Sequence, residues 1–150
     1  RYHRRVLDRV EAVNDEHGTS DWTPVVYTDD DLSREQLTAL YRRADACLVT
    51  SRRDGLNLVA EEFVAASEEH PGALVLSEFA GVAELLGEDA VLVNPFDVEG
   101  LCEAIHRAVT MGEGERRRRL DELLDSVRNH SLSAWIDHHE SVFAGCDGTR

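Results

Sequence analysis

Hydrophobic and polar positions along the chain follow two different periods. Short runs rich in Val, Leu and Tyr have the length and composition of β-strands, and between them apolar residues recur every three or four positions, as on one face of a helix. The predicted strands are residues 23–28, 46–51, 73–77 and 90–95. The predicted helices are residues 4–16, 33–44, 57–66, 97–111, 113–130 and 132–144, with a turn and a short helix within 78–87.

This alternation predicts an α/β fold. Strands that carry nearly continuous Val and Leu are typical of a parallel sheet covered by helices on both faces. We therefore expect one Rossmann-like domain over residues 1–150, with no internal boundary. Four strands are few for a doubly wound sheet, and the sequence opens within a helical pattern, so we expect a portion of a longer enzyme.

Composition narrows the classes of partner. The formal net charge is −14, with 30 acidic residues against 16 basic ones, and all basic residues are arginine. This balance disfavours general nucleic-acid binding, which needs a basic surface. No apolar run approaches the roughly 20 residues that span a bilayer, so no membrane segment is expected. The run "ERRRR" at 115–119 favours a solvated helix face over a phosphate or nucleic-acid patch.

The three cysteines give no metal or disulfide pattern. Cys47 and Cys102 fall in apolar patterns and are interpreted as small core residues, and Cys146 lies in a Gly-containing tail. No Cys/His spacing indicates zinc, and the sequence predicts no metal and no cofactor. An odd number of cysteines without a signal peptide at the start of this sequence predicts a cytoplasmic location.

Candidate chemistry lies where the strands end. Doubly wound sheets bind ligands beyond the carboxyl ends of their strands, and the richest such segment reads "SRRDGLNLVAEEF". Gly55 permits a tight turn or a close ligand approach, and Asn57 is a candidate N-cap. The amides of Leu58 and Val59 would then begin a helix without acceptors, which predicts a phosphate or diphosphate site.

The charged side chains of the same segment extend this hypothesis. Arg52 and Arg53 could contact the same anion, while Asp54 and Glu62 could accept hydrogen bonds from sugar hydroxyls. The alternative is an ordinary strand–helix connection whose charges face water, and the residues alone favour neither. The later segment "SEFAG" is interpreted as a capped turn in which Gly81 supplies backbone freedom.

Three segments together resemble a known family. They are "LYRRADACLVTSRRDGLNLVAEEFVAAS", "GALVLSEFAGVAELL" and "AVLVNPFDVEGLCEAIHRAVTM". In this order and spacing they resemble the trehalose-6-phosphate synthases, which are retaining glycosyltransferases with the two-domain GT-B fold. The similarity runs from about Trp22 to beyond Met111 and matches the C-terminal, nucleotide-sugar-binding half. It implies that the N-terminal acceptor domain is absent from this sequence, together with an Arg–Lys clamp on the diphosphate.

The resemblance assigns a role to each matching residue. Asp54 would contact hydroxyls of the donor sugar and is the one residue here expected to act in catalysis. The remaining assignments are Gly55, Leu56 and Asn57 around the donor sugar, the amides of Leu58 and Val59 on the diphosphate, Glu62 on the ribose, and the backbone of Leu32 on the base.

The implied reaction moves glucose from a UDP- or GDP-linked donor to glucose 6-phosphate. The family usually reads T-P-L-R-D-G-M-N-L-V-A-K-E-Y, whereas this chain carries Ser51, Leu56 and Glu61 in place of Pro, Met and Lys. Two alternatives therefore stay open. One is a pseudoglycosyltransferase such as validoxylamine 7′-phosphate synthase, which joins a nucleotide-activated cyclitol to an aminocyclitol phosphate, and the other is a non-catalytic regulatory module. A homo-oligomeric assembly also stays open.

Overall fold

The structure is a computed structural model that describes residues 2–130 and Ile136. The predicted helix at 132–144 falls almost wholly outside these described residues, as do Cys146 and the chain's last residues. The chain divides into two compact units, Arg1–Ser33 and Arg34–Arg150.

The first unit contains one long helix and an extended segment. Helix α1 covers Tyr2–His17, and the Asn14 side chain binds both backbone groups of Val25, with Nδ2 to the Val25 oxygen and the Val25 nitrogen to Oδ1 at 2.9 Å each. The predicted strand at 23–28 is wrong, because these residues form no strand and Val26 is 83% exposed. A strand needs a neighbouring backbone to complete its hydrogen bonds, and the Val25 backbone bonds to a side chain instead.

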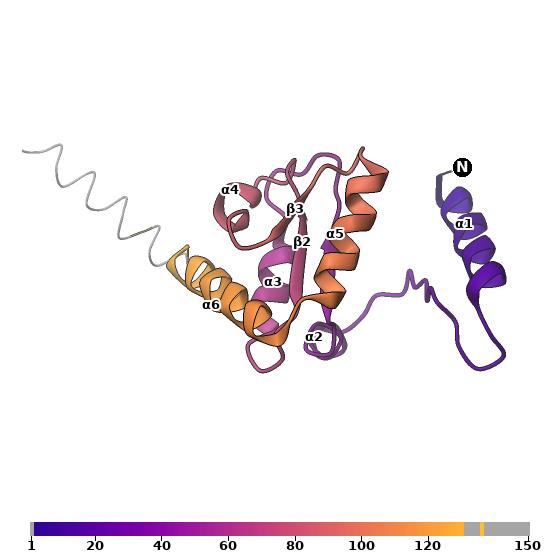
Figure 1. The fold of residues 1–150 in the computed structure, drawn as a ribbon, viewed down its shortest axis with the longest axis horizontal. Helices are drawn as coiled ribbons and strands as arrows, with labels where there is room; N and C mark the ends of the chain where they lie inside the picture. Colours follow the sequence, from indigo (N-terminus) through magenta and orange to yellow (C-terminus); the bar gives the residue numbers. More distant parts are fainter. Residues whose placement is uncertain (1, 131–135, 137–150) are drawn as a thin grey trace, which may run out of the picture. The chain divides into compact units, whose positions relative to one another are not determined.

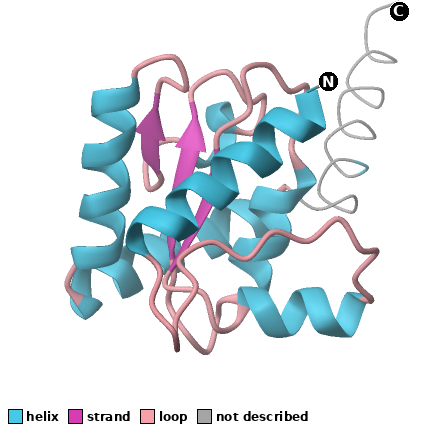
Figure 2. Ribbon diagram, turned by 90° about the vertical axis from the view of Figure 1, so that its right-hand side faces the viewer, coloured by secondary structure: helices cyan, strands magenta, loops and turns pink. Residues whose placement is uncertain are grey.

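The second unit holds a parallel sheet with helices on both faces, which confirms the predicted α/β fold class. The strand order is β1-β2-β3, all parallel, and Figure 2 shows strand arrows that point the same way. The strands are β1 Ala46–Val49, β2 Ala73–Ser77 and β3 Val91–Val93. The helices are α2 Arg34–Tyr41, α3 Leu58–Ala66, α4 Ala83–Leu86, α5 Val98–Thr110 and α6 Glu113–Asn129.

Alternating residues of β2 supply two separate cores. Leu74 and Leu76 pack in a cluster with Phe63 of α3 and with side chains of α4 and α6. Val75 packs on the other face in a cluster with Ala108 of α5. Figure 1 shows α5 and α3 on opposite sides of the strands. All five residues of β2 are buried, as the continuous apolar pattern predicts for a strand covered twice.

Helix α5 corrects one interpretation of the cysteines. Cys47 is half-buried against the first core, but Cys102 is exposed. The buried face of α5 runs through Ala104 and Ala108, and position 102 lies two residues from Ala104, so it falls outside this stripe.

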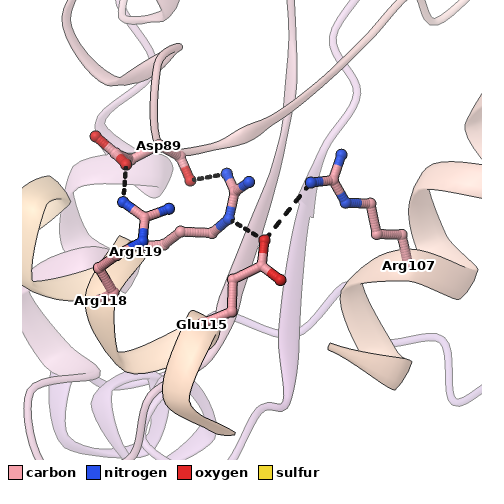
Figure 3. A network of polar contacts seen from close by, with 5 residues as sticks. All are labelled: Asp89, Arg107, Glu115, Arg118 and Arg119. Carbon is pink, nitrogen blue, oxygen red and sulfur yellow. Dashed lines mark hydrogen bonds and ion pairs between the residues drawn. The ribbon is translucent and has the colours of Figure 1, made fainter. Parts of the chain in front are cut away.

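The arginines of α6 bind loops instead of forming a wholly solvated face. In the network of Figure 3, Arg118 Nη1 lies 3.2 Å from Asp89 Oδ1, and Arg119 donates to the Asp89 backbone oxygen at 3.0 Å. Arg119 Nε also contacts Glu115 at 2.9 Å, and Arg107 of α5 lies 3.6 Å from the same carboxylate. Asp89 lies two residues before β3, so the network attaches α6 to the amino-terminal end of that strand.

The other two arginines repeat this arrangement at β1 and β2. Arg116 contacts Asp45, which directly precedes β1, at 3.3 Å, and Arg117 donates to the backbone oxygen of Glu68, between α3 and β2, at 2.7 Å. The side chains of Arg116 and Arg119 are only 15% and 16% exposed. The expectation of a solvated face is therefore wrong for these two residues. The arginines at 116–119 instead attach α6 to the segments that precede the amino-terminal ends of the three strands.

Candidate functional site

The turn that follows β1 is organised around the carboxylate of Asp54. Its Oδ1 accepts a hydrogen bond from the Leu56 amide at 3.3 Å, and its Oδ2 accepts one from Asn57 Nδ2 at 2.8 Å. A carboxylate offers about four acceptor positions, so these bonds leave capacity for further donors such as hydroxyls. Asp54 is half-buried. Its two hydrogen bonds stabilise the turn, and its carboxylate is still partly accessible to solvent.

Asn57 joins this turn to helix α3. Its backbone has φ 84° and ψ 83°, and no other non-glycine residue in the described part of the chain has a positive φ. Asparagine tolerates this left-handed region better than most residues. Its Oδ1 accepts from the Ala60 amide at 3.1 Å, which confirms the predicted N-cap.

The first residues of α3 expose the start of the helix. Leu58 and Val59 are 60% and 45% exposed, and the first amides of an α-helix have no acceptor inside it. Because Asn57 caps Ala60 instead, the Leu58 and Val59 amides are available to an anion, and the helix dipole favours negative charge there.

Gly55 differs from the expectation for the turn. No described glycine has a positive φ, and a Cβ at Gly55 would meet nothing within 4 Å. The turn conformation thus does not require glycine at this position, and its strained residue is Asn57. The open space in front of Gly55 is compatible with the close ligand approach that the sequence also suggested.

Glu62 lies on the exposed part of α3, one turn beyond Leu58. Residues four apart share a helix face, so Glu62 and the start of α3 face the same side. The Tyr41 hydroxyl donates to Glu62 Oε2 at 3.5 Å. Burial and then the charge of Glu62 raise the pKa of Tyr41, so this hydroxyl stays a donor. No sequence pattern predicts the contact between Tyr41 and Glu62, because the two residues lie in different helices, α2 and α3.

The arginines of the turn are arranged differently from each other. The Arg52 guanidinium lies over the ring of Phe96, 5.2 Å from its centroid, and Phe96 meets Phe79 edge to face with centroids 5.9 Å apart. Cation–π contacts of this kind are favourable. Arg52 is therefore engaged with the loop after β3, whereas a role of Arg53 toward an anion stays a prediction.

A second segment, the predicted "SEFAG" turn, lies directly against the first. The Asp54 amide donates to the Phe79 oxygen at 3.3 Å, and the Gly81 amide donates back to the Asp54 oxygen at 3.0 Å. A hollow of about 380 Å³ beside Asp54 is lined by Phe79 and Gly81 among others. The segment is thus part of the candidate site and more than a capped turn.

The remaining predicted residue, Leu32, belongs to the first unit, where it is 37% exposed. Its role toward a base stays a prediction. Within the described residues, no group of three or more His, Cys, Asp or Glu side chains could hold a metal ion. Across the same residues, no helix has the length and apolar character needed to cross a membrane.

Comparison with known proteins adds the family. The model of glycosyltransferase family 20 matches residues 1–144. A trehalose-6-phosphate synthase of Sinorhizobium fredii is 43% identical over 133 residues, which are 88% of this chain and 28% of that protein. The UDP-forming α,α-trehalose-phosphate synthase 2 of Aspergillus fumigatus is 38% identical over 130 residues, covering 87% of this chain and 27% of that protein.

The solved structures that this chain resembles bear the same kind of name as these relatives. One, "Trehalose-6-phosphate from E. coli bound with UDP-2-fluoro glucose", has a TM-score of 0.86 at 38% identity and covers 93% of this chain and 31% of its own. A UDP-forming synthase from Burkholderia xenovorans in complex with glucose-6-phosphate has a TM-score of 0.86 at 38% identity, with 93% and 30% covered.

These matches cover most of this chain but only about 28% of the first relative. The family model spans residues 1–144 of this sequence, and a further solved structure matches 93% of this chain with a TM-score of 0.86. The resemblance read from the three sequence segments is thereby confirmed. The chain belongs to glycosyltransferase family 20.

Proposed function

We propose that this chain is the nucleotide-sugar-binding part of a longer retaining glycosyltransferase that transfers glucose from UDP-glucose to glucose 6-phosphate. The relatives named as UDP-forming synthases support the donor, and the glucose-6-phosphate complex of a similar structure supports the acceptor. The observation that carries the proposal is the exposed start of α3 beside the Asp54–Asn57 turn. The same proposal includes an acceptor domain in another part of the longer protein, a cytoplasmic location and a homo-oligomeric assembly.

In the proposed mechanism, each part of the turn acts on a different part of the donor. The amides of Leu58 and Val59 bind the diphosphate and stabilise the charge that develops on it as the glycosidic bond breaks. Asp54 accepts hydrogen bonds from glucose hydroxyls and so orients the reacting carbon. Glu62 accepts from the ribose hydroxyls, and the backbone of Leu32 contacts the base.

Glu62 offers the sharpest test of the nucleotide assignment. Hydrogen bonds to a charged group contribute about 1.5–3 kcal/mol each, so Glu62→Ala should weaken UDP binding by about tenfold or more. The neighbouring Glu61→Ala is a matched control, because it removes the same charge from the same helix. Calorimetric titration of the complete enzyme measures both, and equal UDP affinity of the two variants would refute the ribose assignment.

Asp54 needs a different readout because it also shapes the turn. Asp54→Ala removes the acceptors of Leu56 and Asn57, so some loss of UDP affinity is expected along with the loss of transfer. The donor-sugar role predicts a larger loss of affinity for UDP-glucose than for UDP. Equal losses for the two ligands would leave Asp54 as a structural residue of the turn only.

One position favours a second candidate, the pseudoglycosyltransferase. Leu56 is 50% exposed, adjoins the donor sugar in the proposed site, and replaces the usual methionine of the family. A donor screen with UDP-glucose, GDP-glucose and a nucleotide-activated cyclitol, each paired with glucose 6-phosphate and an aminocyclitol phosphate, separates the two reactions. Turnover of the cyclitol pair alone would overturn the glucose-transfer proposal, and binding without any turnover would indicate the regulatory module.

A further inference from the structure

We propose that Gly81 is a positioning residue for the nucleotide-sugar site, where the absence of a side chain lets the Phe79–Val82 segment hold the Asp54–Asn57 turn in place. This inference rests on the proposed function of that turn. Gly81 bonds to Asp54 through its amide and lies against the backbone of Gly55 and Leu56, so it would act on the ligand through these three residues of the turn.

The two segments are joined by a ladder of main-chain hydrogen bonds. The Asp54 amide bonds to the Phe79 oxygen at 3.3 Å, the Gly81 amide to the Asp54 oxygen at 3.0 Å, and the Val82 amide to the Leu56 oxygen at 2.9 Å. Asp54 and Ala80 also form a parallel bridge. The parallel pairing of β1 with β2 thus resumes beyond the carboxyl ends of both strands, where the ligand would bind.

Space, and not backbone freedom, explains the glycine. Gly81 has no positive φ, so the backbone conformation itself is open to any residue. A Cβ at Gly81, however, would overlap the carbonyl oxygen of Gly55 and crowd the Leu56 amide. Both obstacles are backbone atoms, so no side-chain rotation can relieve the overlap, and one of the two segments must move.

Movement of the turn reaches the anion site directly. Leu56 bonds to Val82 and precedes Asn57, whose side chain caps α3 and whose amide group holds Asp54. A displaced Gly55–Leu56 peptide therefore shifts the N-cap and the first amides of α3 together. A misplacement of about 1 Å in a reacting site can lower the rate by about 100-fold.

The experiment compares Gly81→Ala with Gly114→Ala in the complete enzyme. Gly114 lies in the first turn of α6, where a Cβ meets nothing within 4 Å. The Gly114→Ala control therefore adds the same methyl group outside the Asp54–Asn57 turn. For Gly81→Ala we expect at least tenfold weaker UDP binding and a raised KM for UDP-glucose, with the KM for the sugar-phosphate acceptor unchanged. Gly114→Ala should match the wild type in all three.

The outcomes separate this inference from the proposed function. A wild type that does not bind UDP overturns both. A wild type that binds UDP, with a Gly81→Ala variant that binds it equally well or loses only thermal stability, overturns the positioning role alone.

A second measurement covers the case in which Gly81→Ala does not fold. Hydrogen exchange of the wild-type Gly81 and Val82 amides should slow at saturating UDP, because these amides bond to the turn that holds the ligand. Unchanged exchange of both amides would overturn the inference.

Discussion

Asn57 provides the most direct test of the turn, because its backbone and its side chain can be perturbed separately. Its φ of 84° would cost alanine about 1–2 kcal/mol and glycine almost nothing. Alanine also loses the N-cap bond to Ala60, typically about 1 kcal/mol, whereas glycine at an N-cap loses only a few tenths. Both variants lose the bond to Asp54 equally.

These terms predict a specific order of stability. Glycine raises the entropy of the unfolded chain, which offsets about 0.4–1 kcal/mol of its advantage. The net expectation is that Asn57→Ala is less stable than Asn57→Gly by about 1.5 kcal/mol. With a denaturant slope near 2 kcal/mol per molar, this corresponds to a urea midpoint lower by about 0.7 M.

The assay is equilibrium urea unfolding of the wild type and both variants at one pH, with unchanged slopes as the control for two-state behaviour. Asn57→Asp is an informative third variant, because it keeps a cap acceptor but places a second carboxylate where an amide now donates to Asp54 at 2.8 Å. Its stability should recover toward low pH as one carboxyl protonates. Equal midpoints for Asn57→Ala and Asn57→Gly would refute the reasoning from the left-handed backbone.

Three further predictions concern the core and the titratable groups. Phe63 is fully buried, so Phe63→Ala should lower the free energy of unfolding by about 3–5 kcal/mol; a loss below about 1 kcal/mol in urea unfolding would contradict its place in the core. Burial raises the pKa of Cys47 to about 11, so iodoacetamide at pH 8 should label exposed Cys102 before Cys47, and stability should fall as pH rises from about 9 toward 11. Arg119 lowers the pKa of Glu115, so the contribution of Glu115 is present above its usual pKa near 4.5 and disappears at lower pH; Glu115→Gln should flatten this part of an acid titration.

Local sequence patterns predicted the parts of the fold that depend on local physics. The parallel strands β1, β2 and β3 follow from short, continuous apolar runs, and the N-cap at Asn57 follows from its place before a helical pattern. Strand 23–28 was wrong because pairing depends on a neighbour, which a propensity for β-structure does not supply. The predicted strands 46–51 and 90–95 were also too long, because β1 ends at Val49 and β3 covers only Val91–Val93.

The parts that the sequence could not predict are contacts between distant segments. Gly81 looks like any flexible turn residue until the Gly55 carbonyl is placed against it. Tyr41 likewise shows no sign of its contact with Glu62, because the two side chains come from different helices. Hydrophobic periods specify which face of an element is buried, but they do not specify which loops meet at the end of a sheet.

The two ends of the sheet are held by different kinds of interaction and therefore respond differently to salt. Ion pairs such as Arg118–Asp89 hold the amino edge, and added salt screens exposed pairs of this kind. Main-chain hydrogen bonds between the Asp54 and Gly81 segments hold the opposite edge, and ionic strength has little effect on them. Salt should therefore weaken the exposed ion pairs of α6 while the main-chain hydrogen bonds that hold the ligand-facing turn persist.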